Sequence, residues 1–325
     1  MKKIKYVERG FFGNVFEFEY PGGYVFTNNP ECDDYDWLLA FEDMSKERPE
    51  SLKCPRECTI LATWEPVSIK DYGKVFTRQF GHLLTNRPRE AENHPHYHFG
   101  QGYFLWGIIR SYEEACKMKM PPKDKLLSII CSNKQMRHTQ HHERFELIKH
   151  LAAAIPGAEW YGKGVKPILY KQDALDTFKY HVAIENHIAP GHWSEKIIDP
   201  ILCECLTFYA GDPELGKVLP ERSFIPIPIG DPKECERIIK AAIEGGEYEK
   251  RLDDIREAKR LLLTKYNLWA QTAKIIEEAE ADKNFKPQFR EGVTIYSRHG
   301  LRKHNPLAAL EDGYLHLKRL IKTGA

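Results

Sequence analysis

The residues best suited to chemistry lie between Lys179 and Ile227. An apolar run, Tyr180–Ile184, ends on two polar side chains, Glu185 and Asn186. In an open parallel sheet, ligands bind beyond the carboxyl ends of the strands. If this run is such a strand, the sequence predicts a binding site at its end.

A loop containing His192 leads from this strand to a predicted helix that begins after Ser194. Serine is a good N-cap, and the free N–H groups of a helix start favour a bound phosphate. Lys196 in the first turn opposes the helix dipole, a conflict that an anionic ligand would resolve. Glu195 could accept hydrogen bonds from ribose hydroxyls. The alternative is a capped surface helix whose charge pair is solvated.

These side chains belong to a stretch in which strands and helices alternate. Strands are expected at 126–131, 158–161, 180–184, 207–210 and 223–227, and helices at 144–155, 171–178, 194–206 and 232–243. Such alternation is typical of a parallel sheet with helices on both faces. An apolar stripe within 248–281 predicts one long helix packed on the domain, with a coiled-coil partner seam as the alternative. The stripe consists of Leu262, Tyr266, Trp269, Ala273 and Ile276.

The first part of the chain is less regular. Apolar runs at 37–41, 59–63 and 74–80 look like strands of one sheet whose helices are poorly marked. The run Met120–Lys123 contains two prolines and cannot continue a helix or a central strand. A chain of 325 residues exceeds what one core usually serves. We therefore expect an acceptor-binding domain over 1–122, a nucleotide-sugar-binding domain over 123–284, and a tail over 285–325 that could cross back to the first lobe.

Several blocks in the second half resemble the signature of family 10 glycosyltransferases, the α-1,3/1,4-fucosyltransferases. That signature has a strand ending in Phe-Glu-Asn, an aromatic near Thr-Glu-Lys, a small strand ending in Gly, and Pro-x-x-Ser-Phe-Ile. The corresponding blocks here are Ile184-Glu185-Asn186, His192-Trp193-Ser194-Glu195-Lys196, Tyr209-Ala210-Gly211 and Pro220-Glu221-Arg222-Ser223-Phe224-Ile225. Upstream, Ile130-Cys131-Ser132-Asn133 is similar to a strand of the family that ends in Ser-Asn. In the family a helix that opens with Arg follows this strand, and Arg144 is in the corresponding position here. The resemblance covers roughly residues 125–230.

The resemblance implies an α/β, GT-B-like fold, in which two Rossmann-type lobes have a cleft between them. It also implies inversion by direct displacement without an essential metal, with GDP-fucose as donor substrate and no cofactor required for catalysis. By position, Arg144 and Lys196 would hold the donor pyrophosphate and Glu195 would contact the ribose. Glu185 and Asn186 would line the donor pocket.

Two positions bear on the sugar and the acceptor. His192 stands where the family usually carries Tyr near the donor sugar, so the identity of that sugar stays open. An inverting transferase also needs a general base for the acceptor hydroxyl. The family places a Glu after an N-terminal strand and next to a Pro, which makes Glu65 in Trp64-Glu65-Pro66 the candidate. The alternative for Glu65 is an ordinary loop carboxylate.

Three alternating histidines, His94, His96 and His98, would share one face of a strand. Three imidazoles can bind Zn²⁺, but no fourth ligand is evident. We expect no metal here, and instead a loop near the acceptor in which these side chains bind sugar hydroxyls. A metal-binding module built on the histidines is the alternative.

Composition limits the partners. The formal net charge is +1, which gives no reason to expect a nucleic acid. No apolar run is long enough to span a bilayer, and the eight cysteines are expected to be reduced thiols. These features predict a cytoplasmic protein, or a soluble fragment of an anchored enzyme. The expected partners are a GDP-sugar and a glycan acceptor. The alternatives are another nucleotide-sugar donor, or a non-catalytic nucleotide- or carbohydrate-binding protein.

Overall fold

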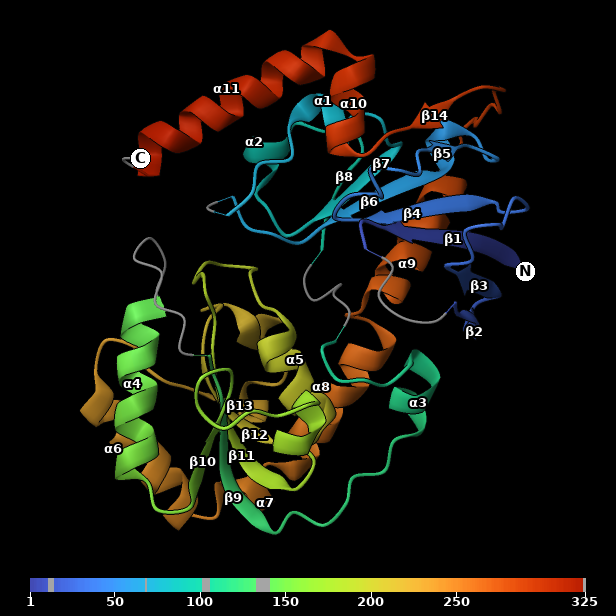
Figure 1. Ribbon diagram of the computed structural model, residues 1–325. Coiled ribbons are helices and arrows are strands. Elements are labelled where there is room, and N and C mark those ends of the chain that lie inside the picture. Colours follow the sequence, from blue (N-terminus) through green and yellow to red (C-terminus); the bar gives the residue numbers. More distant parts are fainter. Residues whose placement is uncertain (11–14, 68, 101–105, 133–140, 324–325) are drawn as a thin grey trace. The chain divides into compact units, whose positions relative to one another are not determined.

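The computed structural model describes residues 1–10, 15–67, 69–100, 106–132 and 141–323. The chain divides into two compact units: unit 1 comprises Met1–Gly100 and Trp269–Ala325, and unit 2 comprises Gln101–Leu268 (Figure 1). The boundaries thus fall at Gly100 and Leu268 rather than at the expected 122 and 284. The second difference arises because the helix that starts at Leu268 packs its Trp269 in the core of unit 1.

Unit 2 contains a five-stranded sheet in the order β10-β9-β11-β12-β13, with every pair parallel. The bounds are β9 Lys125–Ile130, β10 Ala158–Tyr161, β11 Phe178–Ile184, β12 Leu206–Ala210 and β13 Phe224–Pro226. Numbered along the chain, this is the doubly wound order 2-1-3-4-5. The direction of winding reverses between β9 and β11, so these two strands flank the topological switch point.

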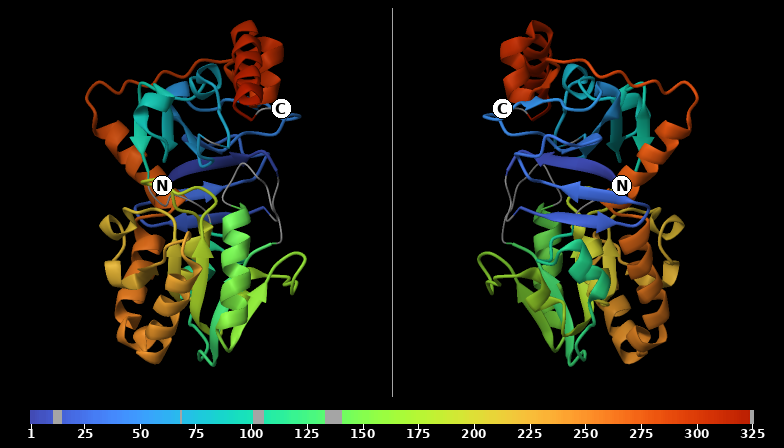
Figure 2. Two further views of the ribbon diagram at one scale, coloured as in Figure 1. Left: turned by 90° about the vertical axis from the view of Figure 1, so that its left-hand side faces the viewer. Right: turned by 90° about the vertical axis from the view of Figure 1, so that its right-hand side faces the viewer.

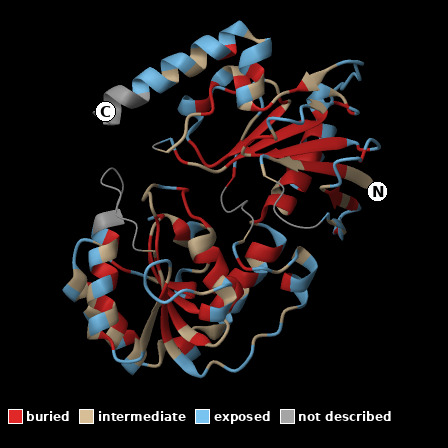
Figure 3. Cartoon of the chain, in the orientation of Figure 1, coloured by how far each residue is buried: buried red, intermediate tan, exposed pale blue. Residues whose placement is uncertain are grey.

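Helices cover both faces of this sheet (Figure 1). On one side lie α4 (His141–Ala154) and α6 (Pro232–Glu244), and on the other lie α5 (Glu195–Leu202) and α8 (Leu252–Thr264). The central strands β11 and β12 and the middle of β9 are therefore buried on both faces, as Figure 3 shows in red, which explains their apolar sequences. A shorter helix, α3 (Tyr112–Lys117), also belongs to this unit. The α/β class that the alternating pattern predicts is confirmed.

Two predicted helices of unit 2 differ from the structure. The segment expected as a helix over 171–178 is one 3-10 turn, η2 (Lys171–Ala174). The expected long helix over 248–281 is wrong, because it is three helices, α7 (Glu247–Lys250), α8 and α9 (Leu268–Ala281). The break before α9 has a local cause: the Asn267 side chain donates to the carbonyls of Leu262 and Leu263 and so ends α8. The apolar stripe is divided between two helices of different units: Leu262 lies in unit 2, whereas Trp269, Ala273 and Ile276 lie in unit 1, and all four are buried.

Unit 1 contains a seven-stranded sheet in the order β2-β3-β1-β4-β6-β7-β8, parallel except for the β2–β3 pair. The bounds are β1 Lys2–Glu8, β2 Glu17–Tyr20, β3 Tyr24–Thr27, β4 Trp37–Phe41, β6 Thr59–Thr63, β7 His82–Thr85 and β8 Tyr97–Phe99. Its short helical pieces are η1 (Arg56–Cys58), α1 (Lys74–Thr77) and α2 (Arg89–Glu92). Without β2, the order again begins 2-1-3-4-5. Both units are therefore doubly wound, as a GT-B-like fold requires of its two lobes.

One expected strand of unit 1 is wrong: the apolar run 74–80 forms α1 and a turn. The helix starts there because Gly73 takes φ 80°, a left-handed conformation that glycine adopts without strain. The carboxylate of Glu311 then accepts hydrogen bonds from the backbone N–H groups of Lys74 and Val75, both at 2.8 Å. This cap comes from the far end of the sequence.

The C-terminal segment completes unit 1. Trp269 on α9 packs its ring 4.9 Å from Phe26 and 5.5 Å from Tyr6, centroid to centroid. The short strand β14 (Thr294–Ile295) pairs with β5 (Glu50–Ser51). Beyond it, α10 (Arg298–His304) and α11 (Pro306–Thr323) contact each other, and α11 contacts α1 (Figure 1, Figure 2). Residues 285–325 therefore form part of unit 1.

Among the described residues, no helix is both long and apolar enough to span a bilayer. All eight cysteines are free thiols, and Cys116 is exposed whereas the other seven are buried.

Candidate functional site

The switch point of unit 2 opens onto a hollow of about 290 Å³. Its walls are the carboxyl ends of β9 and β11, together with α4 and α5. Ligands of doubly wound sheets bind at this position. The structure brings together four of the residues that the sequence singles out for donor binding, and all four line the hollow: Arg144, Asn186, Glu195 and Lys196.

Arg144 is a buried cation that forms no ion pair with any carboxylate in the described part of the chain. Its side chain is 8% exposed, and one terminal guanidinium nitrogen donates to the neutral amide oxygen of Asn186. Within the described residues, its buried Nε has no hydrogen-bond partner, and the ion pairs around the hollow involve Lys171 and Lys196 only. A buried charge is costly unless it is paired. An anionic ligand in the hollow would supply the missing partner.

Lys196, in contrast, is compensated by the protein itself. Its Nζ lies 3.3 Å from Glu185 Oε2, 3.4 Å from Glu195 Oε1 and 3.1 Å from Ser194 Oγ. Burial alone would lower the pKa of Lys196, but these two carboxylates outweigh it and leave the pKa above the usual value. The conflict between Lys196 and the helix dipole is therefore resolved by two carboxylates and does not depend on a ligand.

Glu185 anchors the start of α5. Its side chain is 1% exposed, and Oε1 accepts hydrogen bonds from the backbone N–H of Ser194 at 2.9 Å and from its hydroxyl at 2.7 Å. Burial raises the pKa of the Glu185 carboxyl despite the nearby Lys196. The sequence predicts Glu185 as a lining residue of the donor pocket, but the structure places it behind Ser194, where it fixes the helix that carries Glu195 and Lys196.

Close packing explains why position 211, at the end of the Tyr209-Ala210-Gly211 block, is a glycine. A Cβ on Gly211 would lie 2.0 Å from Tyr209 Oη and 2.7 Å from Glu185 Cγ. Since neither neighbour can move far in this buried site, any larger residue at position 211 would displace Glu185 and thereby α5.

His192 is 7% exposed and packs its ring 5.3 Å from that of His187. Burial lowers the pKa of His192 to about 4, so the ring is neutral at pH 7. It lies in the loop before α5 and is not among the residues that line the hollow.

A second ion pair of the hollow was missed by the sequence analysis. Lys171 Nζ lies 2.9 Å from Asp199 Oδ2 and 3.5 Å from Glu195 Oε1. Asp199 is 2% exposed, and its Oδ1 accepts a hydrogen bond from Gly107 N at 2.6 Å. Burial raises the pKa of Asp199 to about 6. The sequence feature that could have indicated this pair is the carboxylate of Asp199 among the apolar residues of the α5 segment.

In unit 1, Glu65 follows the carboxyl end of β6 and is half-buried. Its backbone N–H lies 3.2 Å from Glu42 Oε1 and 3.1 Å from Tyr72 Oη. Glu42 also accepts hydrogen bonds from Trp64 N and Tyr72 Oη and pairs with Lys70 Nζ at 2.8 Å. Glu42 has φ 65°, a strained conformation for a long side chain. This cluster holds the turn on which Glu65 lies, and sequence analysis did not identify Glu42.

The three alternating histidines do not form an isolated group. His94 is 3% exposed, with Nδ1 3.2 Å from the carbonyl of His96 and Nε2 3.3 Å from the carbonyl of Phe80. His98 lies on β8, with Nε2 3.1 Å from Nδ1 of His82 on β7. Burial lowers the pKa of His94 to about 4 and that of His82 to about 3. No group of three or more His, Cys, Asp or Glu in the described part of the chain is placed to hold a metal ion.

No family model and no curated protein matches the chain. Solved structures resemble it at low identity. An α1,3-fucosyltransferase with GDP-fucose is 14% identical with a TM-score of 0.48 over 82% of this chain and 83% of that one. The Anabaena protein HepE in complex with UDP-glucose is 11% identical with a TM-score of 0.42, covering 77% and 80%. Sucrose-phosphate synthase from Thermosynechococcus elongatus is 8% identical with a TM-score of 0.42, covering 85% and 88%. With TM-scores below 0.5, these similarities assign neither a donor nor a reaction to this chain.

Proposed function

We propose that this protein is an inverting glycosyltransferase that transfers fucose from GDP-fucose to a hydroxyl group of a glycan acceptor. The observation that supports this most is the buried Arg144 at the switch point of unit 2, which has no counter-ion among the described residues. A diphosphate in the hollow would pair with this guanidinium, and a planar guanidinium is well suited to bind phosphate oxygens.

The proposed reaction is a single displacement. The acceptor oxygen bonds to the anomeric carbon while the bond between that carbon and the diphosphate oxygen breaks, and the electron pair leaves with GDP. Arg144 and Lys196 stabilise the negative charge that grows on the leaving diphosphate. Glu195 contacts the ribose, and Glu65 takes the proton of the acceptor hydroxyl.

The donor sugar and nucleotide need a test of their own, because His192 stands where the family that the sequence resembles usually carries Tyr. The same hollow can accept a different nucleotide-sugar without any change in the roles of Arg144 and Lys196. In the proposed mechanism both residues contact the diphosphate, which GDP-, UDP- and ADP-sugars share.

The first experiment compares thermal shifts with GDP, UDP, CMP and ADP at matched concentrations. A ligand at 100 times its Kd stabilises the folded state by about 2.7 kcal/mol. We expect GDP to raise the Tm of the wild type and to have little effect on Arg144→Gln. Lys149→Gln is the matched control, because Lys149 lies on the same helix and is exposed.

The outcomes separate the alternatives. A shift with UDP alone would retain the site and change the donor. A GDP shift without GDP release from GDP-fucose across an acceptor panel would identify a binding protein rather than an enzyme. No shift with any nucleotide, or an equal shift in Arg144→Gln, would contradict the proposed donor site.

A further inference from the structure

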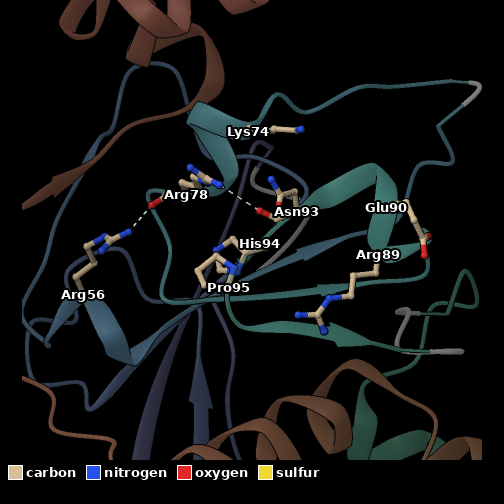
Figure 4. Close-up of a pocket in the computed structure, with 8 residues that line it drawn as sticks. All are labelled: Arg56, Lys74, Arg78, Arg89, Glu90, Asn93, His94 and Pro95. Carbon is tan, nitrogen blue, oxygen red and sulfur yellow. Dashed lines mark hydrogen bonds between the residues drawn. The ribbon is translucent and has the colours of Figure 1, made fainter.

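A second hollow, of about 760 Å³, lies on unit 1. It is formed by the segments that precede β6, β7 and β8, together with α2 (Figure 4). Arg56 precedes β6, whereas Glu65 follows it, so the hollow and the candidate base lie at opposite ends of this strand. The mechanism proposed above makes no use of it.

The walls of this hollow are strongly basic. Four cationic side chains and one carboxylate line it, namely Arg56, Lys74, Arg78, Arg89 and Glu90. The whole chain has a formal net charge of only +1, so this excess of positive charge is local. Its field reaches the neighbouring His94, whose pKa is lowered first by burial and also by Arg56.

None of these four cations forms an ion pair with a carboxylate within the ranges that the structure describes. Two other carboxylates of this region, Glu92 and Glu311, are engaged elsewhere. Glu92 pairs with Arg87 at 2.7 Å, and both oxygens of Glu311 accept backbone N–H groups at the start of α1. The positive charge is therefore available to a ligand.

Backbone carbonyls hold two of the arginines in place without neutralising them. Arg56 donates from Nε to the carbonyl of Gln79 at 2.9 Å and from a terminal nitrogen to the carbonyl of Arg78. Arg78 in turn donates to the carbonyl of Asn93 at 3.4 Å (Figure 4). These contacts fix the guanidinium groups at the rim, which reduces the entropy that binding would cost.

We propose that this hollow binds a small molecule with two or more phosphate or sulfate groups. Arginine forks match tetrahedral oxyanions, and four cations exceed what a single carboxylate could balance. A volume of about 760 Å³ is within the range of small-molecule sites. The hollow is therefore large enough for a ligand that carries two or more phosphate or sulfate groups.

Protection of Lys74 from amine acetylation, followed by mass spectrometry, tests the proposal at this site. We expect inorganic triphosphate or a sulfated heparin disaccharide to slow the acetylation of Lys74 at least tenfold at saturation, and the two probes distinguish phosphate from sulfate ligands. Lys46, exposed beyond β4 and outside the hollow, is the control within each sample. The measurement reports on Lys74 in unit 1, whereas Arg144 and Lys196 belong to unit 2.

The double variant Arg78→Gln/Arg89→Gln provides the second arm. It should keep the Tm of the wild type and raise the concentration needed for half-protection of Lys74 about tenfold or more, since two charge-assisted contacts are lost. Lys74 acetylation that neither probe slows, or protection equal in the double variant and the wild type, would overturn the proposal. Either result would leave the donor site of unit 2 untouched.

Discussion

The two units share the 2-1-3-4-5 strand order but treat buried charge differently at the carboxyl ends of their strands. In unit 2, Arg144 is 8% exposed and donates to the neutral amide of Asn186, and it has no carboxylate partner within residues 1–10, 15–67, 69–100, 106–132 and 141–323. In unit 1, Arg87 follows β7, is 3% exposed, and pairs at 2.7 Å with Glu92, which is 5% exposed. Among the described residues, the same scaffold thus holds a cation paired with a carboxylate in one unit and a cation without one in the other.

This difference indicates how one topology serves two purposes. The hydrogen bonds and the ion pair at Glu42 support the turn that presents Glu65. In unit 2, Arg144 has no carboxylate partner among the described residues. Under the proposed function, the unit that supplies the base needs rigid positioning, whereas the unit that receives the diphosphate needs unneutralised charge.

The largest expected effect is on catalysis. Glu65→Gln should lower the rate of GDP release from GDP-fucose at least hundredfold with acceptor present, because a general base contributes about 10²–10⁴-fold. The Kd for GDP should not change. Glu57→Gln is the control, since Glu57 is an exposed carboxylate at the other end of β6. Retention of most of the activity in Glu65→Gln would remove the catalytic role from unit 1.

The contrast between the two arginines predicts opposite effects on stability. Arg87→Met leaves Glu92 buried and unpaired and should cost about 3–5 kcal/mol of unfolding free energy. Arg144→Met removes an unpaired buried charge and should leave the unfolding free energy unchanged or raise it. Urea unfolding without nucleotide measures both. A loss for Arg144→Met as large as that for Arg87→Met would show that Arg144 is compensated in the protein.

Lys196→Ala should lower the turnover of the folded protein at least tenfold, because the loss of a charge-assisted contact is worth about 1.5–3 kcal/mol. It should also lower the unfolding free energy, because the buried Glu185 loses its cation. Circular dichroism checks the fold and GDP release the turnover. Lys240→Ala is the matched control, because Lys240 forms an exposed pair with Glu236 on α6. A fully active Lys196→Ala enzyme would assign Lys196 to the support of Glu185 and Glu195 alone.

The smallest effect concerns pH. Burial lowers the pKa of His82 from 6.5 to about 3, so the unfolded chain binds this proton between these values and the folded chain does not. Stability should therefore fall as the pH drops from 6.5 towards 3, by about 1.4 kcal/mol per pH unit from this group. Urea unfolding at pH 7 and pH 5 should show a shallower dependence for His82→Gln than for the wild type. Equal slopes would mean that His82 is not buried as a neutral ring.

Local patterns predicted where several residues of the unit 2 hollow lie, although their role as a donor site stays a prediction. Asn186 follows the apolar strand β11, and Glu195 and Lys196 follow an N-cap, so neighbours in sequence already indicated their placement. The Lys171–Asp199 pair depends on segments separated by 28 residues, and its partners have no local feature in common. Sequence patterns therefore found residues at element ends and missed pairs formed across the fold.

The incorrect strand prediction over 74–80 also arises from a contact between segments that are distant in the sequence. The run 74–80 is apolar enough to look like a strand, and Glu311, whose carboxylate caps α1, lies 237 residues from Lys74. Glu42 escaped notice for a similar reason, because the backbone groups it binds follow the next strand, β6. Tertiary contacts of this kind override local propensity.

The return of α9 and β14 to unit 1 has a consequence for synthesis on the ribosome. The first hundred residues emerge without Trp269, so Tyr6 and Phe26 lack the ring that packs against them. Unit 2 is continuous in sequence and emerges from the ribosome before residues 269–325, the last segment of unit 1. The N-terminal sheet is thus translated before unit 2 but completed after it, and its aromatic side chains stay without Trp269 until that last segment emerges.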